Sequence, residues 1–179
     1  MKNVFSLLIL ITFLGCGNTA TEKETASKSS NPTESEKSVS DATTSASVKI
    51  FKDDKLVVEY KMAFPKAGIA TFKSGEKEFT LGLSNDDNKY NLIATLEKPA
   101  SGNYSIGKAE GNAGLQLTTD GKGPVPFLTI LTEGTFKITL NGETCSGSFI
   151  GSQKEPGSEN IKITGDFTSV PLLKKTVNY

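Results

Sequence analysis

Beyond residue 47, apolar and polar residues alternate at a period of two, and this alternation most constrains the fold. One face of the clearest run carries Leu56, Val58, Tyr60, Met62 and Phe64. No amphipathic helix of useful length follows residue 20. Turn signals separate the runs at Asp53-Asp54, Ser74-Gly75, Asn85 to Asn88, and Asp120-Gly121. The pattern predicts an all-β domain over residues 47–179, a single antiparallel β-sandwich or barrel of about 8–10 strands.

The clearest hairpin signal is Asn141-Gly142, because both central positions of the tightest hairpin turn favour these residues. A two-residue turn at this point pairs Ile138 with Cys145 and Phe136 with Gly147. Each Phe of the hairpin then faces a Gly, which fills a layer without overpacking. The same register places the Cys145 side chain inside the domain, so we predict a buried thiol.

Three further residues predict where strands end. Pro126 cannot donate a ladder hydrogen bond, so residues 125–131 are predicted to form an edge strand. Gly165 is predicted to be a turn or bulge in the last strand. Pro171 and the following lysines are predicted to end the domain.

Composition excludes several kinds of chemistry. The chain has no histidine, which removes Ser-His-Asp and Cys-His nucleophiles and the usual imidazole zinc sites. It has 20 basic and 20 acidic residues, so no net field favours nucleic acid. We therefore expect no catalytic residue, no cofactor, no metal and no nucleic-acid partner.

Three polar or glycine-rich segments are candidate binding sites. Asn85-Asp86-Asp87-Asn88 could hold Ca²⁺ through its side-chain oxygens, but it lacks the alternating ligand spacing of a calcium loop, so a plain turn is favoured. Asp53-Asp54 is likewise interpreted as a turn. The glycines Gly107, Gly111 and Gly114 lack the strand–helix context of a phosphate loop and indicate an ordinary loop.

Carboxylates could in principle support glycan hydrolysis, which needs two of them in one cleft. The candidates are Glu59, Glu76, Glu78, Glu97 and Glu110. Nothing in the sequence brings two of them together, and solvated strand faces explain them better.

Tyrosines could line an interior cavity or a sugar platform. The candidates are Tyr60, Tyr90 and Tyr104, which on strand faces are more often core or rim residues. A cavity would make the protein a lipocalin-like carrier of a small apolar ligand, whereas a filled core would favour an interaction module.

The N-terminus resembles a bacterial lipoprotein signal peptide. Lys2 gives a positive start, and Val4 to Leu14 is almost wholly apolar. Eleven residues cover ~16 Å as a helix, about half of a ~30 Å hydrocarbon core, which is too short to span it. Phe13-Leu14-Gly15-Cys16 resembles a lipobox. The resemblance implies a signal peptide over residues 1–15 and acylation of Cys16, palmitate included; the alternative is an ordinary secretory signal with an incidental cysteine.

Residues 16–46 are predicted to comprise the lipidated cysteine and a disordered, Ser/Thr-rich tether. Val39 is its only sizeable apolar residue, so the segment cannot bury enough surface to offset ordering entropy. A flexible coil of about 30 residues would hold the domain ~30 Å from a membrane. Glu22, Lys23 and Glu24 fit a solvated spacer better than a surface-export signal.

The C-terminal third resembles small Bacteroidota lipoproteins of unknown function. The resemblance rests on Gly134-Thr135-Phe136, on Cys145 to Phe149, and on Ile161 to Pro171. It implies a lipid-anchored all-β domain and carries over no catalytic residue. We therefore expect a non-enzymatic interaction module, anchored to the outer membrane through Cys16, with a protein or glycan partner. An apolar ligand carrier is the alternative, and a carboxylate-dependent glycan hydrolase is the third hypothesis.

Overall fold

The computed structural model describes residues 43–62, 65–153 and 159–177. The predicted signal peptide, Cys16 and most of the predicted tether lie outside these residues. The described part contains no helix, so the all-β prediction is confirmed, and none of its elements is a helix able to cross a membrane. The first strand begins at Ser45, two residues before the expected start of the domain, and Ala46 is already buried.

Eleven strands form one continuous sheet, slightly more than the number expected. They are β1 (Ser45–Lys52), β2 (Lys55–Met62), β3 (Lys66–Phe72), β4 (Lys77–Ser84), β5 (Tyr90–Glu97), β6 (Gly102–Ser105), β7 (Ala113–Thr119), β8 (Leu128–Ile130), β9 (Glu133–Asn141), β10 (Thr144–Gln153) and β11 (Ile161–Val177).

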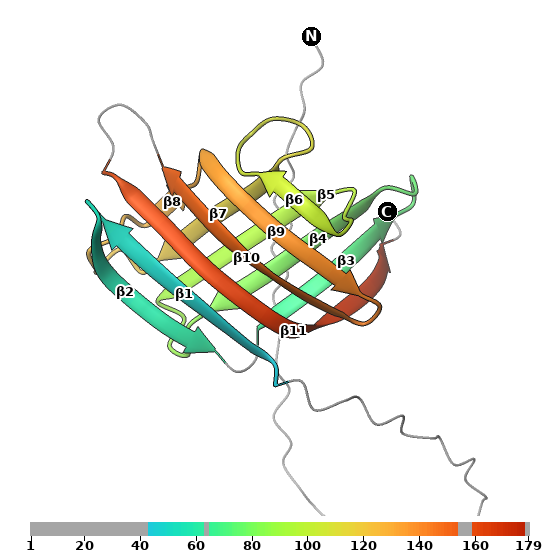
Figure 1. Cartoon of the computed structure of the whole chain (residues 1–179), viewed down its shortest axis with the longest axis horizontal. Coiled ribbons are helices and arrows are strands. Elements are labelled where there is room, and N and C mark those ends of the chain that lie inside the picture. Colours follow the sequence, from blue (N-terminus) through green and yellow to red (C-terminus); the bar gives the residue numbers. More distant parts are fainter. Residues whose placement is uncertain (1–42, 63–64, 154–158, 178–179) are drawn as a thin grey trace, which may run out of the picture. The chain divides into compact units, whose positions relative to one another are not determined.

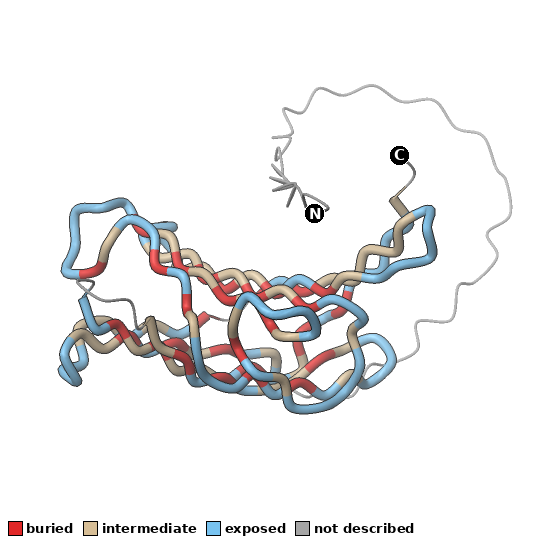
Figure 2. Tube along the Cα trace, turned by 90° about the horizontal axis from the view of Figure 1, so that it is seen from above, coloured by how far each residue is buried: buried red, intermediate tan, exposed pale blue. Residues whose placement is uncertain are grey.

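The sheet curls so that two layers face each other (Figures 1 and 2). The front layer of Figure 1 has the strand order β2-β1-β11-β10-β9-β6, and the rear layer has the order β11-β3-β4-β5-β7-β8. Neighbouring strands are antiparallel except β11 and β3, which run parallel. Strand β11 belongs to both layers and joins them.

The change of layer within β11 corrects two predictions. Residues 161–168 of β11 pair with β1, and residues 172–177 pair with β3. Ser169, with a φ of 51°, and Pro171 lie where the strand passes between the layers. Pro171 therefore does not end the strand, because it stands where the strand leaves its first partners. Gly165 is not a turn or bulge either; it pairs in register with Val48.

The core lies between the two layers, where alternate side chains of both are buried (Figure 2). Three fully buried phenylalanines occupy its centre: Phe79 from the rear layer, and Phe136 and Phe167 from the front layer. The ring centroids of Phe136 lie 6.3 Å from Phe79 and 6.1 Å from Phe167. Such spacing is typical of aromatic contact, so the rings link the layers directly.

The β9–β10 hairpin forms where predicted but in a different register. Asn141 pairs with Thr144, so Gly142 rather than Asn141 is the first central residue of the turn. Gly142 has a φ of 60°, and Asn141 is not in the left-handed region. The pairing differs by two residues from the predicted one, which leaves every side chain on its predicted face. Cys145 is accordingly buried, as predicted.

Candidate functional site

Four strand segments end the two layers: β2 and β6 in the front layer, and β8 and residues 172–177 of β11 in the rear layer. Strand β2 carries Lys55, Glu59 and Lys61, and charges of this kind discourage edge-to-edge association. The β11 edge carries Lys174 and Lys175, and strands β6 and β8 are short, with four and three residues. Strand β8 lies in the uncharged segment 125–132, which contains Phe, Leu and Ile. The edge position predicted from Pro126 is confirmed.

The pairing of β8 with β7 fixes which backbone groups face outward. The Thr119 N–H donates to the Phe127 carbonyl at 2.9 Å, and the Leu131 N–H donates to the Leu115 carbonyl at 3.0 Å. Hydrogen-bonded and non-bonded pairs alternate along an antiparallel ladder. Phe127, Thr129 and Leu131 therefore turn their backbone groups toward β7, and Leu128 and Ile130 turn theirs away.

Leu128 and Ile130 are the residues that face away from β7. Their N–H and C=O groups have no hydrogen-bond partner in the part of the chain that the structure describes. We call these four backbone groups the β8 edge. The side chains of the two residues are also exposed, 46% for Leu128 and 39% for Ile130. Phe127 beside them is 67% exposed.

On the outer surface of the rear layer, the side chains nearest the β8 edge carry no charge, and the outward-facing Glu78 and Glu97 lie at one end of β4 and β5. Side chains at alternate positions of β4, β5, β7 and β8 point outward, because the residues between them are buried. We call this surface the uncharged face. It consists of Thr80, Gly82, Ser84, Asn91, Ile93, Thr95, Gly114, Gln116, Thr118, Leu128 and Ile130.

The outer surface of the front layer differs in its chemistry. It carries a salt bridge between Lys49 and Glu59 at 3.5 Å. The Ser47 hydroxyl donates to the Asp166 carboxylate at 2.7 Å on the same surface. This is the polar, solvated face expected of an antiparallel layer. The contrast makes the uncharged face and the β8 edge the candidate functional site.

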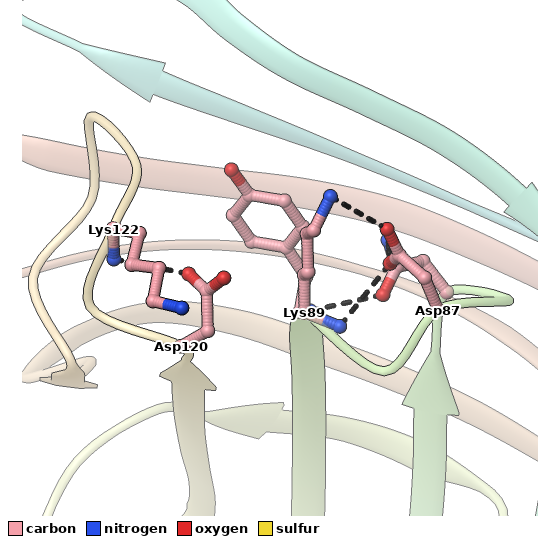
Figure 3. Close-up of polar contacts among 6 residues, drawn as sticks. Asp87, Lys89, Asp120 and Lys122 are labelled. Atoms are coloured by element: carbon pink, nitrogen blue, oxygen red, sulfur yellow. Dashed lines mark hydrogen bonds and ion pairs between the residues drawn. The ribbon is translucent and has the colours of Figure 1, made fainter.

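Charged turns border the rear layer at the end where β5 begins (Figure 3). The Lys89 ammonium lies 2.9 Å from the Asp87 carboxylate, and this hydrogen bond lowers the pKa of Asp87 and raises that of Lys89. The Asp120 N–H donates to the Lys89 carbonyl at 3.2 Å, and the Lys122 N–H donates to the Asp120 carboxylate at 3.0 Å. Asp87 and Asp120 thus each accept a hydrogen bond from a neighbouring lysine residue.

The calcium candidate Asn85 to Asn88 is a turn. The Asn85 side-chain amide donates to the Asp87 carboxylate at 2.6 Å, and the Asn85 side-chain oxygen accepts from the Tyr90 N–H at 2.9 Å. These oxygens already have protein donors, as in an Asx turn. Within the described ranges, no group of three His, Cys, Asp or Glu residues could hold a metal ion.

The other two loop candidates are also structural. Asp53 and Asp54 have φ angles of 49° and 61°, which define the β1–β2 turn. In the loop after β6, the Gly107 N–H donates to the Ala113 carbonyl at 3.1 Å, and Ile106 forms a parallel bridge with Ala113. This loop therefore connects the two layers at the side opposite to β11.

Two of the candidate carboxylates share a shallow depression of about 370 Å³. Its lining residues are Glu97, Lys98, Tyr104, Glu110 and Gly111. The Lys98 ammonium lies 4.0 Å from the Glu110 carboxylate, with side chains 80% and 86% exposed. A solvated pair of this kind does not provide the dry setting that raises the pKa of a catalytic acid.

The other three candidate carboxylates, Glu59, Glu76 and Glu78, do not line this depression. Glu59 pairs with Lys49 on the front layer, and the Glu76 carboxylate accepts from the Ser74 hydroxyl in the β3–β4 turn. Glu78 stands directly opposite Glu97 in the β4–β5 ladder. Burial, and then the charge of Glu97, raises the pKa of Glu78. Glu97 thus neighbours both Glu78 and Glu110, whereas Glu59 and Glu76 lie apart from these three.

The three candidate tyrosines occupy the rim of the core. The rings of Tyr60 and Tyr90 stack at 6.2 Å, which connects β2 to the rear layer. The Tyr60 hydroxyl donates to the Leu83 carbonyl at 3.2 Å, and burial raises the pKa of Tyr60. The Tyr104 hydroxyl donates to the Ala100 carbonyl at 2.8 Å. The hydroxyls of Tyr60 and Tyr104 thus bind backbone carbonyls of the fold.

The interior bears on the carrier alternative. The three phenylalanine rings fill the space between the layers at their centre, where an apolar ligand would have to enter.

Near β8, the Thr129 hydroxyl is buried without a hydrogen-bond partner among the described residues. Burial raises the pKa of the Cys145 thiol to about 12, so this thiol stays neutral at physiological pH.

Comparison with protein-family models, with curated proteins and with solved structures found no match. The candidate site therefore rests on geometry alone. Sequence reasoning identified the β8 segment as an edge but missed the uncharged face. A signal was present, since most outward positions of these four segments carry no charge, the exceptions being Glu78 and Glu97.

Proposed function

We propose that this protein is a non-enzymatic interaction module, anchored to the outer membrane by lipid on Cys16, that binds a protein partner through the β8 edge. The single observation that carries the interaction role is the β8 edge itself. Its outward N–H and C=O groups at Leu128 and Ile130 can accept another strand, and no charge opposes that pairing.

The anchoring part of the proposal is supported by the resemblance of Phe13 to Cys16 to a lipobox. Burial of acyl chains contributes about 0.8 kcal/mol per CH₂, so two chains would hold the protein at the membrane permanently. A module held at a membrane meets its partners at a raised local concentration, so a small contact surface suffices.

Anchoring is tested by comparing the wild type with Cys16→Ala in intact cells. We expect the wild type in the membrane fraction with an acylated Cys16 by mass spectrometry, and we expect Cys16→Ala to leave that fraction. Cys145→Ala is the matched control and should remain membrane-bound. An unmodified mature terminus on the wild type would contradict the anchor.

The interaction surface is tested by photo-crosslinking in the same cells. A photoreactive residue in place of Ile130 should give a cross-linked product, whereas the same residue in place of Ile150 should give none. Ile150 is a suitable control because its side chain is exposed to a similar extent, 46%, on the front layer. Equal cross-linking at both positions, or none at 130, would contradict the proposed surface.

A further inference from the structure

We infer that the partner of the β8 edge is a second copy of this chain, whose β8 pairs antiparallel with the first about a two-fold axis at Thr129. The inference rests on the proposed role of the β8 edge as the contact surface. It adds the identity of the partner and the register of the contact.

The register follows from the position of the outward groups. Leu128 and Ile130 lie one residue to either side of Thr129, and both turn their N–H and C=O away from β7. A two-fold axis at Thr129 therefore sets Leu128 of one copy opposite Ile130 of the other. Residues opposite each other in a bonded pair exchange two hydrogen bonds. Two such pairs use all four groups of each β8 edge.

The side chains are as self-complementary as the backbone. In a two-fold contact each surface meets its own copy, so several charges of one sign on it would lie near the same charges of the second copy. Segment 125–132 has none, whereas the β2 edge carries Lys55, Glu59 and Lys61. Leu128 would lie against Ile130 of the second copy on the outer side. This removes from water two side chains that are exposed in the single copy.

The contact also joins two surfaces of the same kind. Pairing at β8 makes the rear layers of both copies one sheet, so the uncharged face runs across the junction without interruption. The paired strands are short, because β8 has three residues, which span about 10 Å. Stable dimers bury about 1,200–2,000 Å². We therefore expect a weak, reversible dimer that attachment to a shared membrane favours.

The first test is sedimentation equilibrium of the full chain in mild detergent over a range of concentrations. We expect a monomer–dimer equilibrium in the wild type and in Ile150→Lys. We expect at least tenfold weaker association in Ile130→Lys and in Leu128→Lys, because each places a charge opposite the second copy. Thermal unfolding of each variant verifies the fold, and two independent variants guard against the failure of one. A wild type that is monomeric throughout, or variants that associate equally, would overturn the inference.

The second test distinguishes strand pairing from a general apolar contact. Amide hydrogen exchange of Leu128 and Ile130 should slow at least tenfold as dimer forms, whereas the Thr129 amide, which is bonded within the monomer, should not change. Unchanged exchange at 128 and 130 in the dimer would overturn the strand pairing. A cross-link from position 130 to a different protein, with the wild type monomeric, would overturn this inference while leaving the proposed function intact.

Discussion

The ring of Phe167 lies over Gly147 across the β10–β11 ladder, and a Cβ added to Gly147 would stand 2.6 Å from the Cζ atom of the ring. The arrangement is repeated two residues further along with the roles exchanged. There the ring of Phe149 on β10 covers Gly165 on β11. Glycine is needed at both positions because the opposite ring and a neighbouring backbone carbonyl, that of Lys137 at Gly147 and that of Ser47 at Gly165, occupy the space of a side chain.

This relationship predicts that Gly147→Ala and Gly165→Ala each lower the free energy of unfolding by about 1–3 kcal/mol, as overpacked cores do. The measurement is equilibrium unfolding in urea. Gly82→Ala in β4 is the control, since a Cβ there would meet only the Lys66 carbonyl, at 3.9 Å. Equal effects at Gly82 and Gly147 would show that loss of glycine flexibility, not the ring, is responsible.

The buried hydroxyl of Thr129 predicts a stabilising substitution. Thr129→Val keeps the shape of the side chain and removes a polar atom without a partner among the described residues. An unsatisfied buried group costs about 1–3 kcal/mol, so the free energy of unfolding should rise by about 1 kcal/mol. Thr119→Val is the matched control and should destabilise, because the Thr119 hydroxyl donates to the Pro126 carbonyl at 3.2 Å and accepts from the Gly121 N–H at 3.0 Å. A loss of stability in Thr129→Val would contradict the prediction.

The Glu78–Glu97 pair predicts a dependence of stability on pH. Burial, and then Glu97, raises the pKa of Glu78 in the folded state. The folded state thus prefers the protonated form, so the contribution of Glu78 to stability is full below the unfolded-state pKa and is lost as pH rises through the folded-state pKa. Glu78→Gln should therefore stabilise the protein at pH 7, by less than about 1 kcal/mol because the group is partly solvated. The advantage should vanish below pH 4.5, the ordinary pKa. Urea unfolding at pH 7 and below pH 4.5 measures the gain in stability of Glu78→Gln. A gain that does not depend on pH would refute this account.

The buried Cys145 predicts slow thiol chemistry. Because burial raises the pKa of its thiol to about 12, the reactive thiolate is scarce at pH 7 and the sulfur is shielded. A thiol reagent should label Cys145 only after denaturant is added. Ser148→Cys, on the exposed side of the same strand, should be labelled at once in the folded protein. Rapid labelling of Cys145 without denaturant would contradict the register of β10.

The positions of the strands could be predicted because burial imposes the alternation that the sequence displays. The register of the β9–β10 hairpin could not, because Asn141-Gly142 is compatible with two registers that place every side chain on the same face. The path of β11 through Pro171 could not be predicted from the sequence either. It depends on β3, which precedes it by about a hundred residues and lies in the other layer.

The candidate site was predictable only in part. Pro126 indicated an edge from local chemistry alone, and the structure confirmed it. The uncharged face required the spatial order β4-β5-β7-β8, in which β6 is skipped because it joins the other layer. The lipid anchor at Cys16 stays a prediction.

The double membership of β11 also governs the order of events during biosynthesis. Its first half separates β1 from β10, and its second half borders β3, so neither layer has its full set of neighbours until this last strand arrives. Neither layer can therefore be complete until the residues up to Val177 have left the ribosome.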